Sequence, residues 1–309
     1  ILNQAQGDIP LISTSRKELR GQPCYPSVSA LPSTPDVVII VVPASAAMGV
    51  LEECAARGVL FAIVLSSGFG EAGAEGQAME TRMREIVAQS GMRIYGPNCP
   101  GVCNINAKLG MTFSPSFPHD LVPGPIGIAT QGGALGRNFM QAMDRGIGVA
   151  MWSSSGNEVD LQVSDFIAYM ADAADIKVIV TLIEGVRDGR RFVDAVQKAA
   201  RAGKPVVALK VGRSEFGCKA AASHTASITG SAEVNSAALR QLGVIEVDDI
   251  DELVDTAWLL ARAIPSGLGD LGVYATSGGA AALTADIIGQ NGLGRLQPLK
   301  LKLLKIQKI

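Results

Sequence analysis

Short apolar runs alternate with longer amphipathic segments along most of this chain, and the alternation limits the folds open to it. The runs are rich in β-branched residues, as in DVVIIVVP at 36–43, LFAIVLSSG at 60–68 and IKVIVTLIEG at 176–185. Strands that are apolar on both faces need helices on both sides, and helical patterns such as 44–57 and 75–89 separate them. The sequence therefore predicts an α/β protein with parallel sheets.

A segment rich in proline, glycine, asparagine and serine interrupts this pattern between 97 and 125. We place a domain boundary there, so that a first α/β domain covers 1–122 and a flavodoxin-like unit of about five strands covers 123–265. In 266–309, LGVYATSGGAAAL repeats the strand, Gly-Gly turn and helix start of IGIATQGGALG. The repeat predicts the start of a second, incomplete flavodoxin-like subdomain.

The composition favours a protein that acts on small metabolites. The formal net charge is −2 and the basic residues are dispersed, which argues against a nucleic-acid partner. No apolar run reaches the roughly 18 residues of a membrane span, so we expect neither a membrane partner nor a signal peptide. Five cysteines at irregular spacings favour reduced thiols, which predicts a cytoplasmic protein without a metal site.

Three loops combine serine and glycine at the expected carboxyl ends of strands, at 66–70, 130–133 and 153–157. Parallel α/β sheets bind ligands at this edge, where glycine lets the backbone approach and helix N-termini offer free N–H groups. The second and third loops together favour a phosphate or carboxylate site. Each loop alone is explained as well by helix capping and tight turns, and none has the Gly-x-Ser-x-Gly spacing of an α/β-hydrolase.

Two titratable side chains stand close to such loops. Glu184 ends an apolar run, where a carboxylate can orient an imidazole or simply favour the start of the next helix. His224 lies in AAASHTASITGS, a small-residue loop that follows the basic, glycine-containing run LKVGRSEFGCKA. An imidazole in such a loop can carry a phosphoryl group, act as a general base or have only a structural role.

Five motifs, taken in order, resemble the α part of the NDP-forming acyl-CoA synthetases, such as the ADP-forming acetyl-CoA synthetases and, more distantly, the succinyl-CoA synthetase α subunits. They are IYGPNCPGV (94–102), GIATQGGALG (127–136), SSSGN (153–157), LIEGVRDGRRF (182–192) and VGRSEFGCKAAASHTASITGS (211–231). The resemblance implies a Rossmann-like CoA-binding domain at 1–122, whose N-terminal strand and Gly-rich turn are absent, followed by flavodoxin-like CoA-ligase domains. Gly132 stands where many members have serine.

The resemblance also implies a reaction. Acyl-CoA, NDP and phosphate are converted reversibly to a carboxylic acid, CoA and NTP through an acyl phosphate and a phosphohistidine. His224 matches the phosphorylated histidine, and Glu184 matches the glutamate that hydrogen-bonds it. The phosphate-binding positions match Gly132, Gly133, Ser155, Gly156 and Asn157. The CoA-binding positions match Val42, Pro43, Ser67, Gly68, Phe69, Pro97, Asn98 and Cys99.

The implied partners complete these expectations. ATP or ADP with Mg²⁺ is expected on an ATP-grasp β subunit or fused domain that is not in this chain, and we expect an oligomer. The alternative function is a non-catalytic CoA- or acyl-CoA-binding regulatory module, as in fusions to acetyltransferases.

Overall fold

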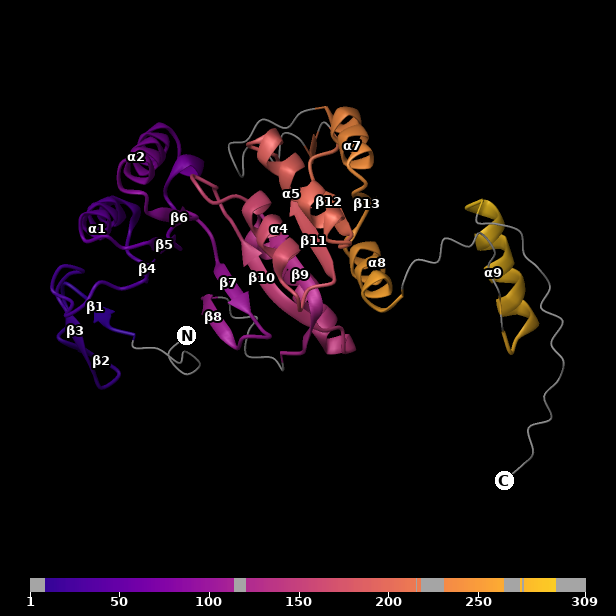
Figure 1. Cartoon of the computed structure of the whole chain (residues 1–309), viewed down its shortest axis with the longest axis horizontal. Coiled ribbons are helices and arrows are strands. Elements are labelled where there is room, and N and C mark those ends of the chain that lie inside the picture. Colours follow the sequence, from indigo (N-terminus) through magenta and orange to yellow (C-terminus); the bar gives the residue numbers. More distant parts are fainter. Residues whose placement is uncertain are drawn as a thin grey trace, which may run out of the picture. The chain divides into compact units, whose positions relative to one another are not determined.

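The computed structural model describes residues 9–113, 121–214, 216–217, 231–263, 273 and 275–292. The chain forms two compact units, Ile1–Arg262 and Ala263–Ile309. In the second unit the described element is helix α9 (Gly278–Gln290), which Ser277 caps by accepting a hydrogen bond from the Ala280 N–H. All other elements belong to the first unit (Figure 1).

The first unit begins with two small sheets. Strands β1, β3 and β2 form one sheet in that order, and β4, β5 and β6 form a parallel sheet whose order follows the sequence. Apolar residues of β4, β5 and β6 pack with those of α1 and α2 into one core. The elements are β1 (Leu11–Ile12), β2 (Glu18–Leu19), β3 (Gln22–Tyr25), β4 (Val37–Ile40), α1 (Ala44–Ala56), β5 (Phe61–Val64), η1 (Gly70–Ala72), α2 (Ala74–Ser90) and β6 (Arg93–Tyr95).

A seven-stranded sheet follows, in the order β13-β12-β11-β9-β10-β7-β8. Its five strands from β9 to β13 are parallel and have the 2-1-3-4-5 order of a flavodoxin-like fold, which agrees with the predicted fold class. The elements are β7 (Gly101–Asn104), β8 (Leu109–Thr112), β9 (Pro123–Thr130), α3 (Gly133–Asn138), η2 (Phe139–Arg145), β10 (Val149–Ser154), α4 (Val163–Asp172), β11 (Val178–Ile183), α5 (Gly189–Arg201), β12 (Val206–Lys210), α7 (Ala232–Gln241), β13 (Ile245–Val247) and α8 (Ile250–Arg262).

The segment 97–125, for which the sequence shows no regular period, contains two of these strands. β7 pairs antiparallel with β10, and β8 pairs antiparallel with β7, so both extend the seven-stranded sheet at its edge. The large sheet is therefore parallel in its five flavodoxin-like strands and antiparallel in the two that precede them. The strands are four residues long, too short for a clear alternation of polar and apolar side chains.

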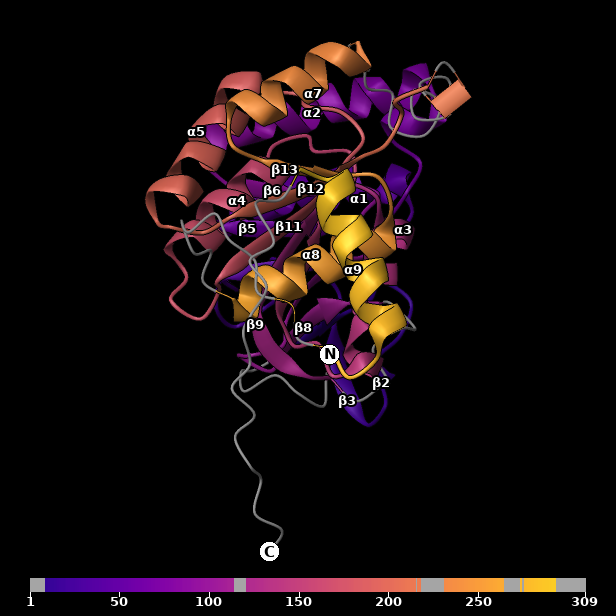
Figure 2. The ribbon, with the colours of Figure 1, turned by 90° about the vertical axis from the view of Figure 1, so that its right-hand side faces the viewer.

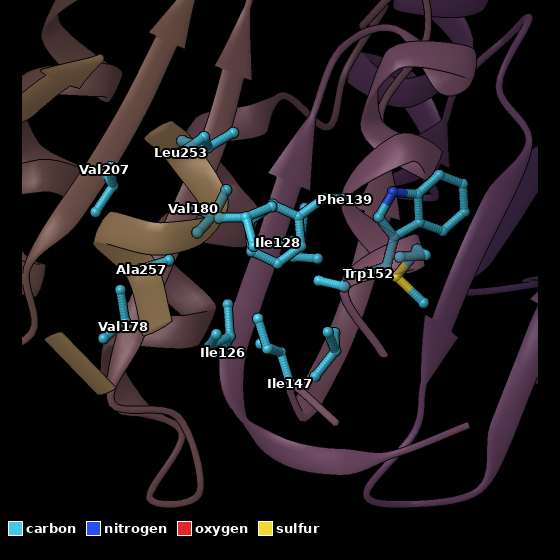
Figure 3. Packing of buried hydrophobic residues seen from close by; sticks show 14 of the residues in the cluster. Ile126, Ile128, Phe139, Ile147, Trp152, Val178, Val180, Val207, Leu253 and Ala257 are labelled. Atoms are coloured by element: carbon cyan, nitrogen blue, oxygen red, sulfur yellow. The ribbon is translucent and has the colours of Figure 1, made fainter. Parts of the chain in front are cut away.

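Helices cover both faces of the large sheet, as the continuous apolar strands require. Figure 2 shows α5 and α7 on one side of the strands and α8 on the other. Ile126 and Ile128 of β9 belong to the cluster on the α8 face, together with Leu253 and Ala257 (Figure 3). The other face packs against α4 and α5 through a separate cluster. No helix in the described part of the chain combines the length and the hydropathy needed to cross a membrane.

Candidate active site

The three segments expected to hold CoA follow β4, β5 and β6, so they meet at one edge of that sheet. The Ser66 hydroxyl donates to the Val42 carbonyl oxygen (2.5 Å), and the Asn98 N–H donates to the Ser66 carbonyl oxygen (2.8 Å). A Cβ on Gly68 would lie 3.3 Å from the Cβ of Ala44, at the start of α1. The structure thus brings the three segments together, as expected for the carboxyl ends of parallel strands.

Three of the expected CoA residues, Phe69, Pro97 and Cys99, are buried within these segments. Phe69 is fully buried in the core of β4, β5 and β6, and Cys99 is 1% exposed with its thiol donating to the Val64 carbonyl oxygen (3.4 Å). Burial raises the pKa of Cys99 to about 12, so this thiol is not a nucleophile at neutral pH. The exposed side chains are those of Pro43 and Ser67.

A cavity of about 180 Å³ lies where these segments meet the large sheet. It brings together four positions expected to bind phosphate and two expected to bind CoA. The described residues that line it are Leu65, Asn98, Cys99, Pro100, Phe113, Gln131, Gly132, Gly133, Arg137, Gly156 and Asn157. Ser155 and the segments at 42–43 and 67–69 are not among them.

One wall of this cavity is the N-terminus of α3. Gly132 is the N-cap residue, with an extended conformation at φ −79° and ψ 136°, and no side chain caps the helix. A Cβ on Gly133 would lie 2.6 Å from Cγ of Pro100, so glycine lets the two walls of the cavity approach closely. A helix start with uncapped N–H groups favours an oxyanion in front of it.

The loop at 155–157 forms another part of the wall but uses its polar groups differently. The Ser155 N–H donates to the Thr130 carbonyl oxygen (2.8 Å), and the Gly156 N–H donates to that of Gln131 (3.1 Å). The Ser155 hydroxyl is fully buried and donates to Oε1 of Glu158 (2.7 Å). These groups hold the loop in place, and the Ser155 hydroxyl is engaged inside the protein.

Asn157 connects this loop to the first domain. Its Nδ2 donates to Oε2 of Glu71 (2.5 Å) and to Oε1 of Glu80 (2.8 Å), while its Oδ1 accepts from Nδ2 of Asn98 (3.2 Å). Glu71 also accepts from the Gly68 N–H (2.6 Å). One carboxylate therefore joins the expected CoA loop to the expected phosphate loop. Burial raises the pKa of Glu71, but the hydrogen bonds from Asn157 and Gly68 outweigh it, and the net pKa is lowered.

A second connection lies beside the first. Arg93 at the start of β6 binds Asp160 through Nε (2.8 Å) and a terminal guanidinium nitrogen (2.9 Å), and Asp160 also accepts from the Ile94 N–H (2.9 Å). The neighbouring Val159 is buried in the core of β4, β5 and β6. The two sheets are thus joined by an ion pair, by hydrogen bonds and by apolar packing.

Glu184 lies at the end of β11, beside the start of α3. A Cβ on Gly132 would lie 2.4 Å from Oε1 of Glu184, so the carboxylate is directly next to the N-cap of α3. Oε1 of Gln131 accepts from the N–H groups of Glu184 (2.7 Å) and Gly185 (2.9 Å). Nζ of Lys210 donates to the Glu184 carbonyl oxygen (2.7 Å). The backbone of Glu184 is therefore held on both sides.

Glu158 is a buried carboxyl group that the sequence analysis did not identify. It accepts from the Ser155 hydroxyl (2.7 Å), the Val163 N–H (2.7 Å) and Nε2 of Gln131 (2.8 Å). Burial raises the pKa of Glu158, against the opposing effect of these hydrogen bonds. The SSSGN motif extends by one residue to include Glu158, but its sequence gives no sign that the carboxyl group is buried.

The proposed phosphohistidine lies outside the described residues. His224 falls within 218–230, so its contacts are not part of the structural description. Among the described residues, no three His, Cys, Asp or Glu side chains form a group that could hold a metal ion.

Two family models match the chain. Residues 2–105 match a CoA binding domain, and residues 123–260 match the succinyl-CoA ligase like flavodoxin domain. The first model covers the sheet of β4, β5 and β6 and strand β7, and the second covers the five parallel strands β9 to β13 of the large sheet.

Two curated proteins are similar to almost the whole length of this chain. Subunit α of the ADP-forming acetate–CoA ligase II of Pyrococcus furiosus is 38% identical over 288 residues, which are 93% of this chain and 62% of that subunit. The ADP-forming acetate–CoA ligase I of Archaeoglobus fulgidus is 39% identical over 293 residues, covering 94% of this chain and 42% of that protein.

A solved structure agrees with these relatives. The dinucleotide-forming acetyl-coenzyme A synthetase 1 of Ca. Korarchaeum cryptofilum, in complex with phosphate and ADP, matches with a TM-score of 0.85 and 33% identity, covering 94% of this chain and 62% of that chain. The chain thus spans less than two thirds of the length of these proteins. The resemblance that the five motifs predict is confirmed by both domain models and by these similarities: the chain combines a CoA binding domain with a succinyl-CoA ligase like flavodoxin domain, and almost its whole length is similar to ADP-forming acetate–CoA ligases.

Proposed function

We propose that this chain is the α part of an NDP-forming acyl-CoA synthetase, an acid–thiol ligase that acts with an ATP-grasp β subunit or fused domain. The observation that carries the proposal is the single cavity that the Gly132–Gly133 helix start shares with Asn98 and Cys99. This cavity supports the proposal because a helix start, whose N–H groups favour an oxyanion, and two residues expected to hold CoA line it together. The relatives are named ADP-forming CoA ligases, which supports the same activity here.

The proposed reaction has three steps. A phosphate oxygen attacks the thioester carbon of the acyl-CoA, the C–S bond breaks, and the CoA thiolate takes up a proton. A ring nitrogen of His224 then attacks the phosphorus of the acyl phosphate, and the carboxylate leaves. The phosphoryl group finally passes from the histidine to the terminal phosphate of an NDP, which forms NTP and restores the imidazole.

The residues have distinct roles in this scheme. Gly132 and Gly133, with Gly156, form the surface that the phosphoryl group approaches, and the N–H groups at the start of α3 stabilise its charge. Glu184 accepts a hydrogen bond from the imidazole and orients it. Ser155 and Asn157 belong to the same site, and their contacts favour a role in holding its loops.

CoA is proposed to lie along the edge formed by the carboxyl ends of β4, β5 and β6. Its contacts would be the segments Val42–Pro43, Ser67–Phe69 and Pro97–Cys99. Since Phe69 and Cys99 are buried, they shape these segments, while backbone groups and the exposed Pro43 and Ser67 face a ligand.

The nucleotide, with Mg²⁺, is proposed to bind the ATP-grasp partner, in an oligomer of both parts in the cytoplasm. We also propose the division of the chain into 1–122, 123–265 and 266–309, in which β7 and β8, at the end of the first segment, pair with the large sheet of the second. The limits of the two family models, 2–105 and 123–260, support the first boundary.

The test is thioester synthesis by the chain together with an ATP-grasp partner. A short-chain carboxylic acid, CoA and ATP should yield acyl-CoA and ADP. The variant His224→Ala should lose this activity, and Glu184→Ala should keep a reduced but measurable rate. Isothermal titration with CoA is the control that the variants remain folded and bind. CoA binding by the wild type without any turnover would refute the synthetase and favour a regulatory CoA-binding module.

A further inference from the structure

Glu184 is held by three residues that surround it at the ends of β9 and β12. Its N–H donates to Gln131, its carbonyl oxygen accepts from Lys210, and its carboxylate lies against the α-carbon of Gly132. We propose that Gln131 and Gly132 are positioning residues, which set the place of the Glu184 carboxylate. This inference rests on the proposed function, because the role of Glu184 toward the histidine belongs to it.

Gln131 acts through the backbone. Its side chain is 6% exposed, and both ends of the side-chain amide make two hydrogen bonds. Oε1 accepts from the N–H groups of Glu184 and Gly185. Nε2 donates to the Gly185 carbonyl oxygen (2.5 Å) and to Oε2 of Glu158 (2.8 Å). Glu158 is itself fixed by Val163, at the start of α4. The chain of hydrogen bonds therefore anchors the turn after β11 to a helix.

Gly132 acts because it has no Cβ, which leaves room for the Glu184 carboxylate. Real Cβ atoms essentially never lie within 3.0 Å of a heavy atom of a residue elsewhere in the chain, whereas a Cβ here would lie 2.4 Å from Oε1 of Glu184. An added methyl group must therefore push the carboxylate away by at least about 0.6 Å. The backbone at Gly132 is extended with negative φ, so alanine fits it without strain, and the only close neighbour is the end of a flexible side chain.

G132A therefore displaces a carboxylate without disturbing the fold. Misplacement of a catalytic group by about 1 Å costs on the order of 100-fold in rate, so we expect a loss between about 10-fold and 100-fold for G132A. Gly189 supplies the matched control, because it also has a negative φ, begins helix α5, and a Cβ there would meet nothing within 4 Å.

The experiment measures the initial rate of phosphohistidine formation from acetyl-CoA and radiolabelled phosphate. The expected result is slow labelling of G132A and wild-type labelling of G189A. In the E184A background, G132A should cause no further loss, because the added methyl group then has no carboxylate to displace. A purely structural effect of G132A would instead persist without the carboxylate.

The role of Gln131 is tested by reversing its hydrogen bond with Glu158, in which Nε2 of Gln131 is now the donor and the Glu158 carboxylate the acceptor. Q131E sets two carboxylates against each other, so labelling should slow, and the loss should shrink as the pH falls and one of them takes up a proton. The double variant Q131E with E158Q restores a donor facing an acceptor and should recover part of the rate. No recovery in the double variant would contradict a role through this hydrogen bond.

A crystal structure of G132A separates this inference from the proposed function. A displaced Glu184 carboxylate supports the positioning role even if the wild type incorporates no label, an outcome that would refute the synthetase alone. An unmoved carboxylate, or labelling of G132A at the rate of G189A, would overturn the inference.

Discussion

The link between the two sheets through Asn157 leads to a quantitative prediction for Asn157→Ala. Nδ2 of Asn157 makes hydrogen bonds to two carboxylates, those of Glu71 (2.5 Å) and Glu80 (2.8 Å). A hydrogen bond to a charged group contributes about 1.5–3 kcal/mol to the free energy of unfolding. Both carboxylates keep other donors, the N–H groups of Gly68 and Gly70, so the lower value applies to each. We expect Asn157→Ala to lower the free energy of unfolding by about 3 kcal/mol.

The assay is urea unfolding together with calorimetry of the whole chain. For a unit of this size, a loss of about 3 kcal/mol lowers Tm by roughly 6–12 °C. Asn138→Ala is the control, since Asn138 is exposed on α3, and it should change the stability by less than about 0.5 kcal/mol.

Asn157→Asp gives a second measurement, in which the loss of stability should depend on pH. The new carboxylate would face Glu71 and Glu80, so its pKa in the folded state is raised above that of the unfolded chain. The loss of stability is then small at acidic pH and grows as the pH rises from about 4 through that raised pKa. Two results would refute this account of the link. One is a decrease in the free energy of unfolding below about 1 kcal/mol for Asn157→Ala. The other is a decrease for Asn157→Asp that is the same at pH 5 and at pH 8.

Three further predictions follow from buried groups and from the second link. Burial raises the pKa of Cys99 to about 12 and those of Cys54 and Cys103 to about 11. Iodoacetamide at pH 8 should therefore spare these three thiols in the native protein and modify the half-exposed Cys24. Peptide mass spectrometry that finds Cys99 modified as fast as Cys24 would contradict this prediction. Burial raises the pKa of Glu158 above its ordinary value of 4.5, so the protonated form stabilises the fold below that value and this contribution is lost as the pH rises through the raised pKa. The stability of the wild type relative to Glu158→Gln, from urea unfolding, should therefore be greater at pH 4 than at pH 7, and the opposite trend would be inconsistent with a raised pKa. Asp160→Ala removes both hydrogen bonds to the half-exposed Arg93 and the one to Ile94. It should lower the free energy of unfolding, measured with urea, by about 1–3 kcal/mol. A change near zero would show that the ion pair does not stabilise the fold.

The sequence predicts the layers of this fold well because its strands are apolar on both faces. The runs at 36–43, 60–68 and 176–185 each contain a strand, and the glycine and serine loops follow strand ends at the edge where the cavity lies. β7 and β8 were not predicted, because four-residue strands between prolines and glycines carry no period. Their place in the seven-stranded sheet depends on the pairing of β7 with β10, far along the chain.

The site was only partly predictable, and the reason is the distance between partners in sequence. Glu71, Glu80 and Asp160 belong to the link between the sheets, but they meet residues 66 to 86 positions away, so no local pattern reveals them. At position 132 this chain has glycine where many members of the family have serine, so a hydroxyl group is missing. The structure shows a further consequence, since the missing side chain leaves the space beside the Glu184 carboxylate open.

The central claim is that His224 carries a phosphoryl group, and mass spectrometry of the phosphorylated protein tests it most directly. The chain would be incubated with acetyl-CoA and phosphate, or with ATP and its ATP-grasp partner, and digested under alkaline conditions that preserve phosphohistidine. We predict a single acid-labile phosphoryl group on the peptide that contains His224, and none in the variant His224→Asn. A wild-type peptide without this group in both reactions, or a label located on another residue, would contradict the account.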